Sequence, residues 1–408
     1  MSERKFDNWM NAYVDYTSSL RSPVVFRKWA ALSVVSGGIG RQAFVRVTGQ
    51  MLFPNLYVLL VSNPGIGKSN AIKFARRILK RVGEPKPIKV TPSRITKRAL
   101  YNVIEASVAT VIRSSAEMYQ HCSVTAMIDE FGVFVKPNDT EFMVDLTDVY
   151  DCPELMDYET ATQGDNKAVN VFFNLIGGTT PKYLKEAWTS SVLDQGFPAR
   201  IILVYSTEQI HPELFGQNDD EDAKIDHEYE TALAEDLKLI HDIHGRFTWE
   251  EKAQKEMVGW FNDGMPPRPT DPRMEHYNTR RHVHMLKLCM LMSAAKRDDM
   301  EIIKSDLDEA RELIIEVESR MPEAIKGIGA NPIRDQMIMV QKFVEGSFAR
   351  TKKAVPEYKI RDLLMNELDP YRVPTMLQEM IIGQWVSALG NEPDRIFLPG
   401  LKQSKENL

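Results

Sequence analysis

The sequence predicts an α/β protein in which helices flank a parallel sheet. Two apolar runs support this fold class, because each has the length of a buried strand and each ends in polar residues. Residues 55–61 lead into the loop 62–69, and residues 124–128 lead into an acidic pair. Strand-like and helix-like patterns also alternate between residues 42 and 205, which is typical of parallel strands joined by helices.

The hydrophobic pattern predicts the elements in chain order. We expect helices over 6–20 and 23–35, strands over 42–48 and 55–61, a helix over 70–82, a short strand over 88–90, helices over about 95–119, a strand over 124–128 and a helix over 141–150. The predicted domains are an amino-terminal helical segment 1–50, a core 51–207, a helical segment 208–328 and a carboxyl-terminal domain 329–408.

Composition limits the class of protein. With 408 residues and 43% hydrophobic content, the chain is long enough for a large core and two or three domains. Cys122, Cys152 and Cys289 have no C-x-x-C spacing, so neither a zinc site nor a disulfide framework is expected. No apolar stretch approaches the ~20 residues of a bilayer span, which predicts a soluble, cytoplasmic protein without a membrane partner. A net charge of −6 argues against a surface broadly coated for nucleic acid, although a ring can gather basic groups on an inner face.

The loop after the strand 55–61 predicts a nucleotide site. It reads Asn63, Pro64, Gly65, Ile66, Gly67, Lys68 and Ser69, and it opens a helix. Small residues let successive backbone amides turn toward a β-phosphate, and the following helix adds the positive end of its dipole. Lys68 is expected to reach the β- and γ-phosphates of ATP, and Ser69 to hold Mg²⁺. Ser62 departs from the pattern G-x-x-x-x-G-K-[ST], which begins with Gly.

An acidic pair, Asp129 and Glu130, follows the apolar strand 124–128. A buried parallel strand delivers such residues to the edge of the sheet. We expect Asp129 to bind the Mg²⁺ water shell and Glu130 to polarise the attacking water.

The segment after the acidic pair contains a predicted hairpin and a polar strand end. Strand-like runs over 157–162 and 168–173 are joined by the turn residues 163–167. The second run leads to Asn174, Thr179 and Thr180, any of which is suited to orient the attacking water beside the γ-phosphate. An ordinary turn capped by threonines is the alternative interpretation.

Arg200 stands directly before the apolar strand 201–205. At this position it can project into the nucleotide site of a neighbouring subunit and neutralise charge on the transferred phosphoryl group. The alternative is an arginine that is solvated or bound in a salt bridge.

Taken together, residues 55–205 resemble the AAA+ class of ring ATPases, in particular the replication ATPases of phages and plasmids, which are superfamily 3-like helicases. The resemblance implies a hexamer or similar ring, with 63–69 as the phosphate loop, Asp129 at the metal, Glu130 as base and Arg200 as the arginine finger. It also implies that Lys167, at the hairpin tip, grips single-stranded DNA.

Two functions remain open at this point. One is an ATP-driven motor that unwinds single-stranded or forked DNA with other replication proteins of a phage or mobile element. The other is an ATP-switched helicase loader or scaffold without processive unwinding. A monomeric P-loop kinase is disfavoured, because no phosphoacceptor pocket is indicated.

The remaining segments resemble accessory parts of the same ATPases. The helical segment 208–328 is similar to their lid, in which an arginine at a helix start touches the γ-phosphate, and Arg280 or Arg281 fits this role unless both simply flank a solvated helix end. Three helices and a short strand over 395–399 in the carboxyl-terminal domain outline a winged helix. Its near balance of charges leaves DNA contact and partner docking equally open.

Overall fold

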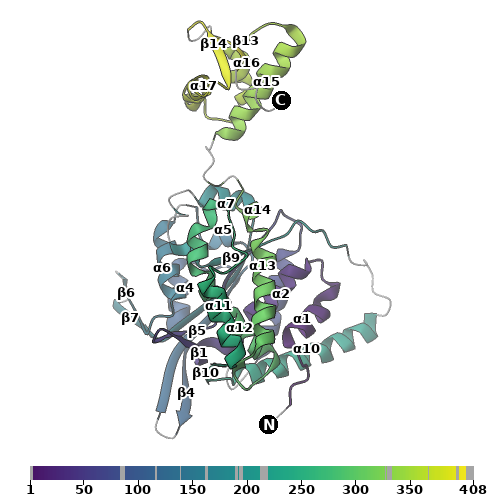
Figure 1. The fold of residues 1–408 in the computed structure, drawn as a ribbon, viewed down its shortest axis with the longest axis vertical. Coiled ribbons are helices and arrows are strands. Elements are labelled where there is room, and N and C mark those ends of the chain that lie inside the picture. Colours follow the sequence, from purple (N-terminus) through teal and green to yellow (C-terminus); the bar gives the residue numbers. More distant parts are fainter. Residues whose placement is uncertain are drawn as a thin grey trace. The chain divides into compact units, whose positions relative to one another are not determined.

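The structure is a computed structural model that describes residues 3–82, 88–114, 117–137, 139–160, 164–188, 192, 196–211, 219–326, 328, 333–365, 367–391 and 395–400. The chain divides into two compact units, residues 1–328 and 329–408. Each unit has its own hydrophobic core, one within residues 9–328 and the other within residues 337–397. Figure 1 shows the helices and strands of both units.

A five-stranded sheet in the order β4-β5-β8-β3-β9 organises the first unit. Its strands are β3 (Tyr57–Val61), β4 (Val108–Ser114), β5 (Glu117–Ile128), β8 (Val171–Thr179) and β9 (Ile201–Tyr205). Strands β5, β8, β3 and β9 run parallel, and β4 pairs antiparallel with β5. Every residue of β3 and β8 is buried, as expected for strands covered on both faces. The predicted α/β class with parallel strands is therefore confirmed.

Helices and short strands complete the first unit. The α-helices are α1 (Trp9–Tyr16), α2 (Val24–Ile39), α3 (Lys68–Arg81), α4 (Lys97–Glu105), α5 (Phe131–Phe134), α6 (Thr140–Tyr150), α7 (Pro181–Ala187), α9 (Gly196–Ala199), α10 (Asp219–His241), α11 (Glu251–Asn262), α12 (Glu275–Lys296), α13 (Lys304–Glu318) and α14 (Met321–Ala324), with 3₁₀ turns η1 (Thr17–Ser19), η2 (Gly40–Gln42) and η3 (Pro272–Met274). The short strands are β1 (Ala43–Val47), β2 (Gln50–Leu52), β6 (Leu155–Thr160), β7 (Gly164–Val169), β10 (Gly245–Arg246), β11 (Thr248–Trp249) and β12 (Glu301–Ile302).

The helices expected over 95–119 are present only in the first part of that range. Helix α4 ends at Glu105, and the following residues form β4 and the first half of β5, which pair as an antiparallel ladder. Four of the five residues from Val108 to Ile112 are β-branched, which lowers helix propensity and suits a pleated strand. The strand expected over 88–90 is reduced to a single bridge from Val90 to Thr125.

The predicted hairpin exists, but its register differs from the expected one. Strands β6 and β7 pair from Leu155 opposite Val169 to Thr160 opposite Gly164. Lys167 is therefore an exposed residue of strand β7 opposite Asp157, not a residue of the tip. Asn170 then adopts a left-handed conformation with φ of 49°, which separates β7 from β8. The sequence pattern merged these two strands because their apolar residues are nearly continuous.

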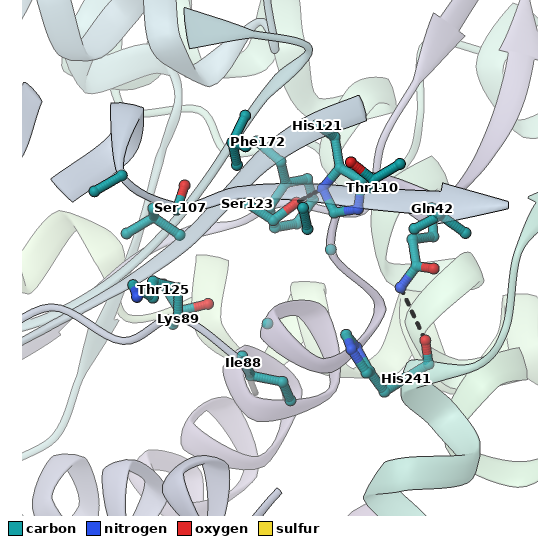
Figure 2. A pocket seen from close by; sticks show the side chains of 17 residues that line it. Gln42, Ile88, Lys89, Ser107, Thr110, His121, Ser123, Thr125, Phe172 and His241 are labelled. Carbon is teal, nitrogen blue, oxygen red and sulfur yellow. Dashed lines mark hydrogen bonds between the residues drawn. The ribbon is translucent and has the colours of Figure 1, made fainter. Parts of the chain in front are cut away.

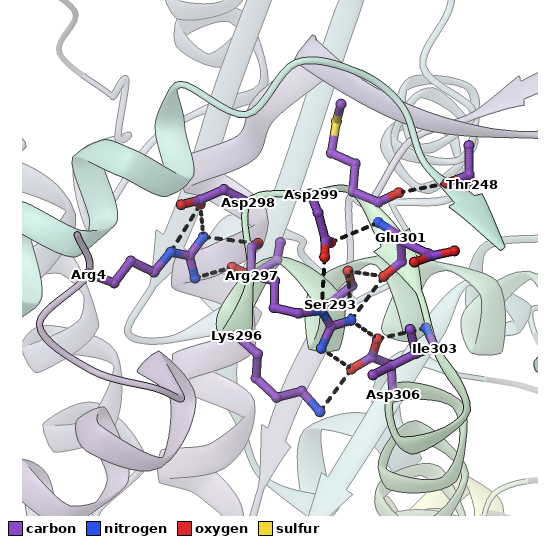
Figure 3. Close-up of polar contacts among 12 residues, drawn as sticks. Arg4, Thr248, Ser293, Lys296, Arg297, Asp298, Asp299, Glu301, Ile303 and Asp306 are labelled. Atoms are coloured by element: carbon purple, nitrogen blue, oxygen red, sulfur yellow. Dashed lines mark hydrogen bonds and ion pairs between the residues drawn. The ribbon is translucent and has the colours of Figure 1, made fainter. Parts of the chain in front are cut away.

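The segments 1–50, 51–207 and 208–328 share one core, so the first unit is a single body. Polar contacts also join its ends (Figure 3). Arg4, near the amino terminus, pairs with Asp298 and donates to the carbonyl oxygen of Ala294 at 2.7 Å. Directly beside it, Asp306 pairs with Lys296 at 2.8 Å and with Arg297. The amino-terminal segment is thus fixed to the end of α12.

The second unit has the order helix, strand, two helices and hairpin. Its elements are α15 (Arg334–Thr351), β13 (Val355–Pro356), α16 (Glu357–Leu364), the 3₁₀ turn η4 (Pro370–Arg372), α17 (Val373–Ile382), β14 (Val386–Leu389) and β15 (Ile396–Pro399). The strands form an antiparallel sheet in the order β13-β15-β14. In the described part of the chain, every helix is too short or too polar to cross a membrane.

Candidate functional site

The predicted polar residues meet where the parallel strands of the first unit end. In the ladder, Val61 of β3 lies opposite Thr179 of β8, and Ile128 of β5 lies opposite Gly177. The loop that starts at Ser62, the acidic pair and Thr179 therefore emerge from the same edge of the sheet. The backbone amide of Ser62 donates to the carbonyl of Thr179 at 3.3 Å, which fixes the start of the loop to β8. We call this region the carboxyl edge.

The loop turns into α3 through Gly67, which has a φ of 92°. A Cβ atom on Gly67 would lie 1.8 Å from the carbonyl oxygen of Arg21, so only glycine fits. Helix α3 begins at Lys68 and buries Ala71, Ile72 and Ala75 against the core. The burial of this apolar face directs the amino end of α3, with its unpaired N–H groups, toward the loop. Asn63, Pro64 and Gly65 are exposed, whereas Ile66 is buried.

Lys68 folds back onto its own loop. Its Nζ donates to the carbonyl oxygen of Ser62 at 2.8 Å, to the Ser62 hydroxyl at 2.9 Å and to the carbonyl oxygen of Asn63 at 3.1 Å. Partial burial lowers the pKa of Lys68, and the nearby negative charge of Glu130 opposes that change. The ammonium group thus lies inside the loop and within electrostatic reach of the acidic pair. Ser69, the next residue, is partly buried.

Gly178 brings the lysine and the acidic pair together. A Cβ atom at Gly178 would lie 2.7 Å from the carbonyl oxygen of Asp129 and 3.5 Å from the Cβ atom of Lys68. The end of β8 therefore packs closely between the residues that follow β5, which include the acidic pair, and the start of α3, which carries Lys68. A larger residue at this position would push the two apart.

Several buried polar atoms at this edge have no hydrogen-bond partner among the described residues. They are Asp129 Oδ1, Thr179 Oγ1, Ser22 Oγ and Arg76 Nε. Ser22 lies against the loop, because its Cα would be 2.8 Å from a Cβ on Gly67. Arg76 Nη2 lies 3.6 Å from Asp129 Oδ1. Unpaired buried polar atoms are costly in a folded protein, and their concentration here is typical of a site that receives a polar ligand.

The carboxyl edge fits Mg²⁺ held together with a phosphate. Mg²⁺ usually takes one or two protein oxygens and keeps water and substrate phosphates as its other ligands. The hydroxyl of Ser69 and the Oδ1 of Asp129, which accepts no hydrogen bond from the described residues, are suitable oxygens. No group of three or more metal-binding side chains occurs in the described ranges, but a site of this kind does not require one.

Glu130 is exposed at the carboxyl edge, whereas Thr179 is buried there. Glu130 is exposed and precedes α5 without capping it through its side chain, so its carboxylate is available at the edge. Thr179 is 2% exposed. Thr180 instead caps α7, because its hydroxyl accepts a hydrogen bond from the Tyr183 amide at 3.2 Å. Of the two threonines, Thr179 is the one with a hydroxyl left for a ligand.

Asn174 was predicted to orient the attacking water, and the structure shows that this prediction is wrong. It lies in the middle of β8, fully buried, where its Nδ2 donates to the carbonyl of Ser33 at 2.9 Å. Its Oδ1 accepts from the amide of Leu56 at 3.0 Å. Both functions of the side chain are therefore used to join α2 and the start of β3 to the sheet, and the strand continues for five residues before it ends.

Arg200 and Arg280 lie at the opposite edge, where the parallel strands begin. Arg200 precedes Ile201, which pairs with the first residue of β3. Its Nη2 is bound to Asp151 at 2.5 Å and its Nη1 donates to the carbonyl of Gly196 at 2.9 Å. The side chain is only 6% exposed, so it does not project from this chain as a finger would. Arg280 also contacts Asp151, at 3.3 Å, and is thus directed away from Lys68.

Arg281 is excluded as a phosphate contact. It is completely buried on α12 and pairs with Glu318 at 2.6 Å, with Trp260 against its guanidinium group. This arginine holds the helices of the 208–328 segment together. Its sequence position next to Arg280 suggested a shared role, but adjacent residues on a helix face different neighbours.

Two residues of the site, Arg76 and Gly178, were not predicted, although the sequence contains a pattern for each. Arg76 follows Ser69 by seven residues, which places both on one side of α3. Gly178 interrupts an apolar strand, as glycine does where another backbone approaches closely. Ser22 has no local signal, since only the tertiary fold brings it to the loop.

A separate cavity of about 300 Å³ lies between the end of α2, the β4–β5 ladder and α10 (Figure 2). His121 and His241 line it, and both are already hydrogen-bonded, to Ser123 at 2.8 Å and to the carbonyl of Gly38 at 2.6 Å. No residue of the loop 62–69 borders this cavity, and neither does Asp129 or Thr179. It is therefore not part of the carboxyl edge.

No protein-family model matches this chain, and no curated protein sequence matches it either. The function is therefore argued from the geometry of the carboxyl edge.

Proposed function

We propose that this protein binds ATP with Mg²⁺ at the carboxyl edge and hydrolyses it. The single observation that carries the proposal is the close approach at Gly178, which sets Lys68 of the loop beside Asp129 of the acidic strand. A lysine after a glycine-rich turn supplies positive charge for phosphates, and a carboxylate at the end of another parallel strand of the same sheet supplies an oxygen for their metal ion. The unpaired buried atoms at the same edge support a polar ligand there.

Each residue has a distinct part in this proposal. The amides of 63–69 and the ammonium group of Lys68 bind the β- and γ-phosphates, and Ser69 and Asp129 hold Mg²⁺. The bound metal ion neutralises charge that develops on the phosphate oxygens. Glu130 accepts a proton from the attacking water, and the Thr179 hydroxyl orients that water. Arg76 supports Asp129, because it contacts this carboxylate and also donates to the carbonyl of Met127.

We further propose that hydrolysis drives a ring-shaped motor on single-stranded DNA, as in the replication of a phage or mobile element. The strand order supports this proposal, because β8, with Thr179 at its end, lies between the loop strand β3 and the acidic strand β5. This is the position that the AAA+ resemblance implies for a polar strand beside the γ-phosphate. The hairpin β6–β7 precedes that strand, and the second unit has the element order of a winged helix.

A helicase loader or scaffold switched by ATP is the second candidate. Two observations favour it over the motor: Lys167 is paired within strand β7, and Arg200 is buried in contact with Asp151. Lys167 is exposed but lies away from the hairpin tip, and Arg200 is not available as a finger.

One experiment separates the two candidates. ATP hydrolysis is measured with and without single-stranded DNA, together with strand displacement on a forked duplex, for the wild type and Lys167→Ala. The motor predicts that DNA stimulates hydrolysis and that Lys167→Ala loses displacement but keeps basal hydrolysis. Hydrolysis that does not respond to DNA supports the switch. A chain that neither binds nor hydrolyses ATP contradicts both.

A further inference from the structure

A groove of about 600 Å³ lies on the first unit between β1, β10 and the helices α11 and α12. Figure 1 shows these four elements in the same part of the unit. No residue of the carboxyl edge borders the groove, so it is separate from the proposed ATP site. Its lining includes Arg46, Arg246, Trp249, Val258, Phe261 and His282. We call this surface the Arg46 groove.

The sequence of α11 builds one wall of the Arg46 groove. Gln254, Met257, Val258 and Phe261 follow the helical spacing of three and four residues and face the groove together. Met257 is buried, but Val258 is 53% and Phe261 48% exposed. Large apolar side chains that stay exposed inside a concave surface gain free energy when a ligand covers them.

The charge of the groove is positive. Arg46 and Arg246 are both exposed, on the paired strands β1 and β10, and the lining contains no aspartate or glutamate. Two glutamates at the start of α11, Glu250 and Glu251, each have a partner within the protein. Glu250 accepts a hydrogen bond from the Lys304 amide at 2.9 Å, and Glu251 pairs with Lys255 at 2.5 Å. The groove therefore suits a ligand that carries negative charge.

Rings make up part of the groove's lining. Phe261 and His282 meet edge to face with centroids 5.3 Å apart, and Trp249 lies partly exposed in the same lining. Burial, together with the nearby positive charge of Arg280, lowers the pKa of His282. The imidazole is thus neutral near pH 7 and serves as a ring rather than as a third cation.

We propose that the Arg46 groove binds a short stretch of single-stranded nucleic acid, with bases on its rings and phosphates on Arg46 and Arg246. Basic grooves with exposed rings bind single strands in this way, because every base has a face that stacks and every linkage carries a charge. An acidic amphipathic peptide would use the arginines but gain less from three rings. The inference rests on the proposed function only in its choice of nucleic acid as partner.

The test is the fluorescence anisotropy of a labelled 20-nucleotide oligo-dT, titrated with the full chain in the absence of ATP. Phe261→Ala should weaken binding by about 5-fold or more, because one stacked base contributes that much. Arg46→Gln combined with Arg246→Gln should weaken it and reduce the slope of log affinity against log salt by about 1.4, as expected for two phosphate contacts. The matched control is Lys238→Gln with Lys252→Gln, which removes two exposed charges outside the groove, leaves the pair of Lys255 with Glu251 intact, and should leave affinity close to that of the wild type.

The melting temperature and basal ATP hydrolysis of each variant show whether it is folded. Unchanged oligo-dT affinity in both groove variants overturns the inference, even if ATP hydrolysis is normal. A wild type that does not bind oligo-dT also overturns it. If oligo-dT does not bind, but a labelled acidic peptide binds the wild type and loses affinity in both groove variants, the partner is a protein and the inference of nucleic acid is overturned. Loss of affinity in the groove variants of a chain without ATPase activity would leave the inference standing while the proposed function falls.

Discussion

The two edges of the central sheet differ in how their polar groups are satisfied. At the carboxyl edge, Asp129 and Thr179 bury oxygens that have no hydrogen-bond partner among the described residues. At the opposite edge, Asp151 binds both Arg200 and Arg280, so the charged groups there pair with one another. Because unpaired buried groups cost stability, they persist where a ligand completes them. Under the proposed function, the polar groups of the carboxyl edge serve binding, whereas the charged groups of the opposite edge pair with one another and hold the fold together.

The largest expected effect is that of Glu130→Gln at the carboxyl edge. Glutamine keeps the shape of the side chain but cannot accept the proton of the attacking water, so turnover should fall by about 100- to 10,000-fold. ATP binding should persist, since Glu130 is exposed and does not hold the loop. Steady-state hydrolysis and an ATP-induced shift in melting temperature measure the two properties. Normal turnover would show that the assignment of Glu130 as base is wrong.

Asn174 and Thr179 lie on the same strand and should respond in opposite ways. Asn174→Ala leaves the Ser33 carbonyl and the Leu56 amide without their partner, which should cost about 2–5 kcal/mol of unfolding free energy. Thr179→Val, its matched control, removes an unpaired hydroxyl and should change stability by less than about 1 kcal/mol while lowering turnover about 10-fold. Denaturant unfolding and hydrolysis rates test both variants. If Thr179→Val destabilises the chain and hydrolyses ATP normally, the distinction fails.

Arg200→Ala tests whether the opposite edge is structural. Loss of the contacts to Asp151 and Gly196 should lower the unfolding free energy by about 1–3 kcal/mol, a range that allows for the half-exposed partner Asp151. The finger hypothesis predicts something else: normal stability, depressed hydrolysis only in the assembled state, and partial rescue when Arg200→Ala is mixed with Lys68→Ala. Rescue together with normal stability would overturn the structural interpretation of this edge.

The smallest effect concerns Lys287, which is buried near the same edge. Its Nζ donates to Asn55 at 2.6 Å and lies 3.8 Å from the centre of the Tyr150 ring. Burial lowers the pKa of Lys287 to about 7 from an ordinary value of 10.5. The unfolded chain therefore binds more protons than the folded chain between these values, and stability should rise with pH by at most about 1.4 kcal/mol per unit. Lys287→Met should flatten this rise between pH 7.5 and 8.5 in denaturant titrations, and an identical slope would contradict it.

The carboxyl edge was predictable because its signals are local. The run from Asn63 to Ser69 and the pair Asp129-Glu130 each follow an apolar strand directly, and parallel strands end together. The burial of Arg200 was not predictable, since it depends on the contact with Asp151, which is 49 residues distant in the sequence. The position of Lys167 depends on strand register, and a shift of a few residues moves it from the tip into the ladder. Local patterns thus predicted which residues meet at the carboxyl edge, whereas positions set by tertiary partners were missed.

The decisive measurement is calorimetric titration of a non-hydrolysable ATP analogue with Mg²⁺ into the wild type, Lys68→Ala and Lys73→Ala. Lys73 is an exposed lysine on the same helix and serves as the matched control. We expect the wild type and Lys73→Ala to bind one analogue per chain and Lys68→Ala to lose binding by about 100-fold or more, because in the proposed site the ammonium group binds the phosphates directly. Equal binding by all three chains, or binding by none, would contradict an ATP site at the carboxyl edge.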